Sequence, residues 1–173
     1  MAEGADGLTV DAARPEAAED PKGREPERGP DREKEQAAGE GRRKCYVTTD
    51  KIRYGDTDRQ GHVNNAVFST FLETGRVEIL YAAEARRHCT GASFVIATLS
   101  LEYLSPLFWP GTVTIETSVT RIGKSSIELF QRILQDGTHA ANGRTVIVQV
   151  DDVTEKGKPL SEEMKAYLKQ YHN

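Results

Sequence analysis

The sequence predicts an α+β fold in which one long helix lies across a curved antiparallel sheet of about five strands. Residues 65–87 carry apolar side chains at helical spacing, whereas several later stretches alternate apolar and polar side chains as half-buried strands do. An antiparallel sheet must cover its apolar face, and this helix is the only element long enough to cover it. We therefore expect a two-layer domain.

The first element is a strand over residues 44–54, and the long helix runs from Asn65 to Arg86 or Arg87. Gly75 lies on the apolar stripe of this helix, which favours a close approach to a neighbouring backbone. Glu73 is displaced from the stripe and has Arg76 at i+3, so we expect a structural ion pair between them.

Four strands follow the helix, with turn residues between them. Their expected ranges are Phe94–Leu104, Thr112–Arg121, Ser126–Leu134 and Thr145–Val153. Because Pro106, Pro110, Gly111, Gly123, Asp136 and Gly137 separate them, we expect antiparallel hairpins. Ser161 is the expected N-cap of a short C-terminal helix that ends near Tyr171.

Residues 1–43 differ in composition from the rest of the chain. They are mainly Ala, Gly, Glu, Arg, Asp and Pro, with almost no large apolar side chain, so they cannot bury enough surface to offset their ordering entropy. We expect residues 1–43 to be a disordered tail and residues 44–173 to form one domain with a single core.

Composition also limits the function. The chain of 173 residues has a formal net charge of -4, and no stretch interleaves aromatic with basic residues, so we expect no nucleic-acid binding. We find neither an apolar run of membrane-span length nor a signal-peptide pattern, and so expect a soluble cytoplasmic protein. Cys45 and Cys89 are far apart and lack metal-ligand spacing, which favours ordinary reduced cysteines.

The polar block RYGDTDRQGHVNN, residues 53–65, joins a strand to the long helix. Such an elbow exposes side chains beside the unpaired N–H groups of the first helical turn, where negative charge is favoured. Asp58, Gln60, His62 and Asn64 are therefore candidate functional side chains. We find no Rossmann or P-loop glycine pattern, so a nucleotide cofactor is not expected.

The block RYGDTDRQGHVNNAVF resembles the 4-hydroxybenzoyl-CoA thioesterase (4HBT) family of the hot-dog fold superfamily, as do FLETGR on the helix and LEYLSPLFWPGTVTIET and TRIGKSSIEL on the strands. The resemblance covers about residues 46–153. It implies hydrolysis of an acyl thioester, on CoA or on acyl carrier protein, without a metal or redox cofactor. It also implies a homodimer or homotetramer with the sites near the subunit interface.

The resemblance gives roles to particular residues. It implies that Asp58 is the catalytic carboxylate, as nucleophile or general base, and that the N–H of Asn65 polarises the thioester carbonyl. His62 matches the histidine of plant acyl-carrier-protein thioesterases, which have asparagine where Gln60 stands here, and its role stays open between chemistry and a hydrogen bond across the elbow. Arg121, Lys124, Ser125 and Ser126 match the family's position for gripping the CoA phosphates, although solvated turn residues are the alternative.

Structural interpretations stand beside these roles. Asp58 could simply cap a turn, as aspartate often does before a helix. Asp56, on an extended segment, would point the other way and hold the loop through backbone N–H groups. Gly61 permits a tight turn and is compatible with substrate contact. Asn64 and Asn65 are the expected N-cap and first helical residue, an arrangement that also provides an oxyanion donor.

The resemblance therefore implies an acyl-CoA thioesterase of hot-dog fold, and this is the function that we expect. A non-catalytic acyl-CoA binding or sensing module and an acyl-carrier-protein thioesterase remain alternatives, whereas the hot-dog dehydratases place their histidine and acid elsewhere. Acyl length depends on the placement of five side chains, namely Phe71, Leu72, Phe94, Phe108 and Trp109. His88, His139 and His172 have no ligand spacing, so we expect no metal.

Overall fold

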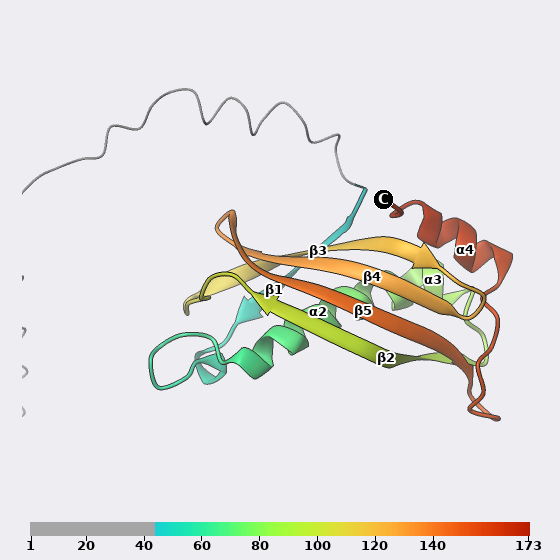
Figure 1. Ribbon diagram of the computed structural model, residues 1–173, viewed down its shortest axis with the longest axis horizontal. Coiled ribbons are helices and arrows are strands. Elements are labelled where there is room, and N and C mark those ends of the chain that lie inside the picture. Colours follow the sequence, from blue (N-terminus) through green and yellow to red (C-terminus); the bar gives the residue numbers. More distant parts are fainter. Residues whose placement is uncertain (1–43) are drawn as a thin grey trace, which may run out of the picture. The chain divides into compact units, whose positions relative to one another are not determined.

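The computed structural model describes residues 44–173 and contains one five-stranded antiparallel sheet with the long helix against one face (Figure 1). The tail expected at residues 1–43 lies outside the described residues. The strands are β1 (Tyr46–Ile52), β2 (Ala92–Tyr103), β3 (Gly111–Ile122), β4 (Ser126–Gln135) and β5 (Thr138–Asp151). The helices are the 3-10 turn η1 (Tyr54–Asp56), α2 (Asn65–Tyr81), α3 (Ala83–Arg86) and α4 (Glu162–Lys169).

The strand order is β1-β3-β4-β5-β2, so β2 forms an edge of the sheet. Strands β3, β4 and β5 are joined as the expected hairpins. The hairpin expected between β2 and β3 is wrong, because β2 pairs with β5 and the chain crosses to the other side of the sheet before β3 begins. This connection, residues 104–110, carries Leu107 into the core and ends at the elbow.

Helix α2 buries the predicted apolar stripe, but it ends earlier than expected. Ala82 has ψ of 152°, which stops the helix at Tyr81, and the short α3 follows. The apolar spacing in the sequence continues beyond this break, because Ala85 and Cys89 are buried as well. Spacing alone therefore did not show where the helix ends. The α2 helix packs over β1, β3 and β4, and it contacts β2 through Tyr103 and Phe94, near the two ends of that strand. Between them, Ile96 and Leu99 are 50% and 38% exposed.

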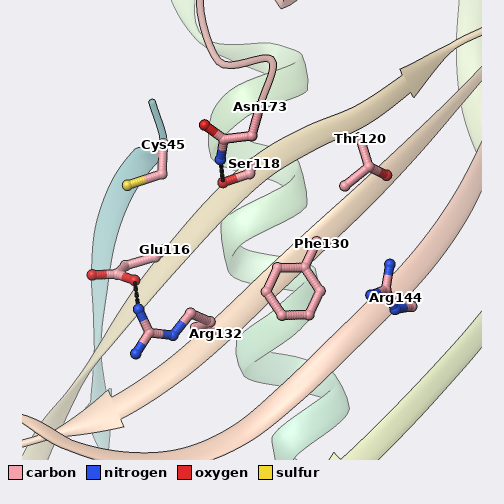
Figure 2. A pocket seen from close by; sticks show the side chains of 8 residues that line it. All are labelled: Cys45, Glu116, Ser118, Thr120, Phe130, Arg132, Arg144 and Asn173. Atoms are coloured by element: carbon pink, nitrogen blue, oxygen red, sulfur yellow. Dashed lines mark hydrogen bonds and ion pairs between the residues drawn. The ribbon is translucent and has the colours of Figure 1, made fainter. Parts of the chain in front are cut away.

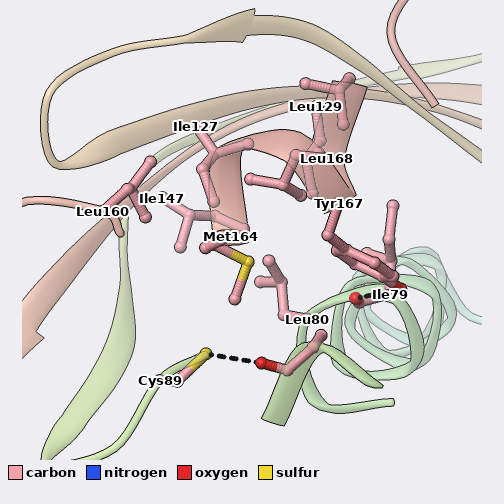
Figure 3. Close-up of a cluster of buried hydrophobic side chains, with 12 residues drawn as sticks. Ile79, Leu80, Cys89, Ile127, Leu129, Ile147, Leu160, Met164, Tyr167 and Leu168 are labelled. Atoms are coloured by element: carbon pink, nitrogen blue, oxygen red, sulfur yellow. Dashed lines mark hydrogen bonds between the residues drawn. The ribbon is translucent and has the colours of Figure 1, made fainter. Parts of the chain in front are cut away.

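Two groups of buried side chains fill the space between the layers. One surrounds the first half of α2 and includes Phe68, Phe71 and Leu72 with Ile115 and Ile133. The other surrounds the second half of α2, where α4 closes the layer (Figure 3). It includes Ile79, Leu80, Ile127, Leu129, Ile147, Leu160, Met164 and Leu168. The N-cap of α4 is Ser161, as predicted, with its hydroxyl accepting from the N–H of Met164 at 3.1 Å.

Gly75 lies where α2 comes closest to the sheet. A Cβ at this position would lie 2.6 Å from Nε2 of Gln131, 2.7 Å from Cγ2 of Ile115 and 2.9 Å from Oγ1 of Thr117. The close neighbours are therefore strand side chains, and not the backbone that the sequence suggested. Gln131 is fully buried and donates from Nε2 to the carbonyl of Leu72 at 2.9 Å, so it has little freedom to move aside.

We expect Gly75→Ala to lower the free energy of unfolding by about 1 to 3 kcal/mol, because overpacking outweighs the gain in helix propensity. Thr70→Ala is the matched control, since it adds alanine to the same helix at an exposed position and should be neutral or slightly stabilising. Chemical denaturation measures both. A Gly75→Ala variant more stable than the wild type would mean that the sheet yields to the added methyl group.

Candidate active site

Asp56 closes the first part of the elbow between β1 and α2. Its Oδ2 accepts from the backbone N–H of Arg53 at 2.6 Å, and its carbonyl accepts from the N–H of Asn64 at 2.8 Å. The role in holding the loop is as expected, but the residue ends the 3-10 turn η1 and is not on an extended segment. Asp56 thus fixes the distance between the end of β1 and the start of α2.

Asp58 organises the tight loop that follows. Its Oδ1 accepts from the N–H of Gln60 at 2.7 Å and from the N–H of His62 at 3.1 Å, while its own N–H donates to the carbonyl of His62 at 2.7 Å. Gly61 has φ of +81°, a conformation that suits glycine, and donates to the carbonyl of Asp58 at 3.1 Å. The turn role of Asp58 is real, yet it uses Oδ1 alone, since no hydrogen bond to Oδ2 is found among the described residues.

The first residue of α2 has a backbone N–H without a hydrogen-bond partner among residues 44–173. Asn64 is the N-cap and Asn65 the first helical residue, as predicted. The side chain of Asn64 accepts from the N–H of Ala66 at 3.0 Å, and its carbonyl accepts from the N–H of Val67 at 2.9 Å. The N–H of Asn65 donates to no described residue, and Asn65 as a whole is exposed. It therefore stands unpaired at the positive end of the helix.

The imidazole of His62 does not hydrogen-bond to Asp58 in this structure. Its ring packs edge-on against Phe108 with 5.2 Å between ring centroids, and the two residues form an isolated backbone bridge. The neighbouring Val63 donates to the carbonyl of Leu107 at 2.9 Å. These contacts hold the elbow against the connection between β2 and β3.

A hollow of about 270 Å³ opens beside the helix start, lined by Val63, Asn65, Phe68, Tyr103 and Ser105 among others. Tyr103 is a residue that the sequence did not single out. Its hydroxyl donates to the carbonyl of Asn65 at 3.1 Å, and its ring packs on Phe68. A strand-end tyrosine carries no sequence signal for this contact, which depends on β2 lying beside α2.

The five side chains expected to set acyl length divide into two groups. Phe71 and Leu72 are completely buried in the core and line no hollow that we find in the described part of the chain. Phe108 and Trp109 are about half exposed near the elbow, where Trp109 packs against Tyr54. Phe94 lies near the start of β2, away from the elbow and close to the end of α2, where its N–H donates to the hydroxyl of Tyr81.

The residues expected to grip CoA phosphates lie far from the elbow within one chain. Gly111 starts β3 opposite Ile52 at the elbow end of the sheet, and Arg121 lies ten residues further, about 33 Å along the strand. Arg121 and Lys124 are exposed, as suits either interpretation. The carbonyls of Lys124 and Ser125 accept from Leu160 and Gln149, and the carbonyl of Ser126 accepts from Gly123. One chain alone does not bring this hairpin to Asp58.

A larger hollow of about 480 Å³ lies on the opposite face of the sheet, with α2 behind it (Figure 2). Its arginines already have acidic partners, since Arg132 pairs with Glu116 at 3.1 Å and Arg144 with Glu128 at 4.0 Å. Arg144 also lies over the ring of Phe130, 5.0 Å from its centroid. Because the sheet separates it from the elbow, we do not assign it to the active site.

Residues 44–173 contain neither grouped metal ligands nor a membrane-spanning helix. In that range we find no group of three or more His, Cys, Asp or Glu side chains arranged to hold a metal ion. No helix in the same range is both long enough and apolar enough to cross a bilayer.

Residues 52–168 match the thioesterase-like superfamily, and the chain therefore belongs to that superfamily. It is 30% identical over 125 residues to the long-chain acyl-CoA thioesterase FadM of Escherichia coli, covering 69% of this chain and 94% of the relative. It is 27% identical over 124 residues to the acyl-CoA thioester hydrolase YbgC of Escherichia coli, covering 69% and 92%.

Solved structures agree with this assignment. A predicted thioesterase from Bacillus stearothermophilus superposes with a TM-score of 0.66 and 26% identity, over 75% of this chain and 97% of that one. A thioesterase from Thermus thermophilus, solved with coenzyme A and Zn, gives 0.62 and 26%, over 71% and 90%. The hot-dog fold and the 4HBT resemblance predicted from the sequence are confirmed.

Proposed function

We propose that this protein hydrolyses acyl-CoA to the free acid and CoA, with Asp58 as the catalytic carboxylate and the N–H of Asn65 as the oxyanion donor. The observation that carries the proposal is the presence, in one elbow of the described chain, of a carboxylate oxygen without a hydrogen bond and of the unpaired N–H of the first residue of α2. The names of its relatives support the substrate class.

The chemistry follows from these two groups. A thioester carbonyl develops negative charge on oxygen when it is attacked, and a fixed N–H at a helix start stabilises that charge. As general base, Asp58 takes a proton from water while the water oxygen attacks the carbonyl carbon. As nucleophile, it forms an acyl anhydride that water then hydrolyses. In both routes the C–S bond breaks and CoA leaves as a thiolate, which takes up a proton.

We assign the other elbow residues supporting roles. Gln60, Gly61 and Asn64 shape the loop around Asp58 and the helix start, and in our proposal they border the bound pantetheine arm. His62 donates its backbone N–H to Asp58, which holds the carboxylate in place, and its packing on Phe108 favours a positioning role over proton relay.

Acyl carrier protein and CoA present the same phosphopantetheine arm, so the elbow alone does not separate the two carriers. The test compares thiol release from one acyl group carried on CoA and on acyl carrier protein. We expect kcat/KM to be higher for the CoA thioester. A higher value for the carrier-protein thioester would reverse the substrate assignment, and binding of both without turnover would favour the sensing module.

We propose that two copies pair through β2. One edge of this strand of 12 residues has no partner in the sheet, and its apolar side chains Ile96 and Leu99 are 50% and 38% exposed. Unpaired apolar edges are templates for a further strand. Antiparallel pairing about a two-fold axis would bring the partner's β3–β4 hairpin to the elbow end of this chain, which supports a phosphate-binding role for Arg121, Lys124, Ser125 and Ser126.

Leu99→Lys is expected to split the dimer, because it places a charge on the pairing edge, while the fold is retained at this partly exposed site. Val153→Lys is the control, since Val153 is 90% exposed and lies in the turn after β5. Analytical ultracentrifugation of both variants gives the masses. A Leu99→Lys protein that stays dimeric would place the interface elsewhere. We also propose a cytoplasmic location, because the sequence has no apolar run of membrane-span length. Fractionation of cells tests this location.

A further inference from the structure

Arg76 is a buried arginine with no acidic partner. It lies on α2, is only 5% exposed, and its Nη1 is fully enclosed without a hydrogen-bond partner. The ion pair that the sequence suggested with Glu73 is not formed, since no carboxylate of the described residues lies within 4.0 Å of the guanidinium. Burial lowers the pKa of Arg76 and the nearby Glu73 opposes this effect, yet arginine stays charged.

Arg76 lines a hollow of about 140 Å³ between α2 and β2. The other walls are mostly apolar, from Val77, Leu80, Phe94 and Ile147 among others, and Glu73 adds one carboxylate to the same lining without forming an ion pair with Arg76. An unpartnered buried charge is unfavourable unless a ligand of opposite charge completes it. The planar fork of a guanidinium matches a carboxylate, and the apolar walls suit the hydrocarbon that carries one.

The hollow faces the same side of α2 as the proposed oxyanion donor. Arg76 follows Asn65 by 11 residues, which is close to three full helical turns and about 16 Å along the axis. β2 runs antiparallel beside the helix, with Tyr103 bonded to Asn65 at one end and Phe94 bonded to Tyr81 at the other.

A row of apolar side chains on the inner face of β2, which we call the apolar lane, lies between the hollow at Asn65 and the hollow at Arg76. Its members Ile96, Leu99 and Tyr103 are each at least 38% exposed. If a second copy pairs through β2, it would cover the solvent-exposed side of this apolar lane. An acyl chain whose thioester lies at Asn65 can follow this lane to Arg76.

We propose that Arg76 binds the far carboxylate of a dicarboxylic acyl group, so that the preferred substrates are ω-carboxyacyl thioesters of medium to long chain. This inference rests on the proposed thioesterase function and adds its substrate class. A methyl terminus would leave the guanidinium unpaired, whereas a terminal carboxylate gives it a charge-assisted hydrogen bond. The site therefore distinguishes substrates by the terminal group of the acyl chain.

The test compares kcat/KM for dodecanedioyl-CoA and dodecanoyl-CoA, with longer and shorter pairs, using the full-length protein. We expect the wild type to favour the diacid by about tenfold or more, as hydrogen bonds to charged groups do. Arg76→Met keeps the apolar stem and should abolish this preference while retaining turnover of the monoacid. Arg87→Met, at an exposed arginine beyond α3, is the control and should keep the preference.

A second readout does not depend on turnover. Free dodecanedioate should raise the Tm of the wild type more than dodecanoate does, and Arg76→Met should lose this difference. Equal or better hydrolysis of monoacids at every length, or a diacid preference that survives in Arg76→Met, would overturn the proposal. If no thioester is hydrolysed but free dodecanedioate still raises the Tm in an Arg76-dependent way, the carboxylate site is supported and the proposed thioesterase function is contradicted. Should Arg76→Met not fold, Arg76→Gln and the wild-type comparison decide.

Discussion

Asp58→Asn is expected to lower kcat for acyl-CoA hydrolysis by roughly 10²- to 10⁴-fold, the range that a positioned acid or base contributes. The amide keeps an oxygen that accepts from the N–H groups of Gln60 and His62, so the loop should hold its shape. Only the ionised Oδ2 is lost. Steady-state thiol release measures turnover, and circular dichroism with acyl-CoA binding shows whether fold and affinity survive.

Asp56→Asn is the matched control for this variant. It makes the same chemical change two residues away, where the carboxylate bonds the N–H of Arg53 and has no proposed part in the reaction. We expect a less than tenfold change, from loop loosening alone. If the Asp58→Asn protein turned over at the wild-type rate, Asp58 would have only its turn role.

Asn65→Pro is expected to lower kcat by about 10²- to 10³-fold, because it deletes the backbone N–H proposed to stabilise the oxyanion. Asn65 is the first residue of α2, where proline is well tolerated. The preceding Asn64 has φ of -59° and ψ of 138°, a conformation compatible with a following proline. The helix should therefore form normally, and steady-state kinetics report on the N–H alone.

Asn65→Ala separates the backbone from the side chain, since it keeps the N–H and removes the amide group. We expect it to turn over near the wild-type rate. Equal losses in both variants would assign the effect to the side chain, and an unimpaired Asn65→Pro protein would place the oxyanion donor elsewhere. Thermal denaturation confirms that each variant is folded.

The sequence predicts those parts of the fold in which a local pattern is complete. Burial alternates along β4 and along β3 as far as Thr117, as the sequence pattern predicts, whereas Ser118 is buried out of turn just before the register shift that follows Val119. β5 begins at Thr138, seven residues before the expected start. The sequence did not predict these residues as strand because Ala140, Ala141 and Gly143 are small and show no alternating pattern. Their size has a tertiary cause, since a Cβ at Gly143 would lie 2.6 Å from Cδ1 of Leu72. Strand order was likewise not predictable, because pairing of β2 with β5 is a long-range contact.

The candidate site shows the same division. The motif identified the elbow, the capping by Asn64 and the first helical residue, all of which depend on neighbours in sequence. The burial of Arg76 and the contact of Tyr103 with Asn65 depend on how β2 lies against α2. Helical spacing allows an ion pair between Glu73 and Arg76, but in the structure the two side chains line the same hollow without one.

The most direct test of the central claim is thiol release from a panel of acyl-CoAs by the purified wild-type protein, covering short, long, aromatic and ω-carboxyl acyl groups. We predict saturable turnover of at least one class, with free acid and CoA formed in equal amounts. A folded protein that is stabilised by acyl-CoA yet hydrolyses none of them would contradict the account and identify the elbow as a binding site without catalysis.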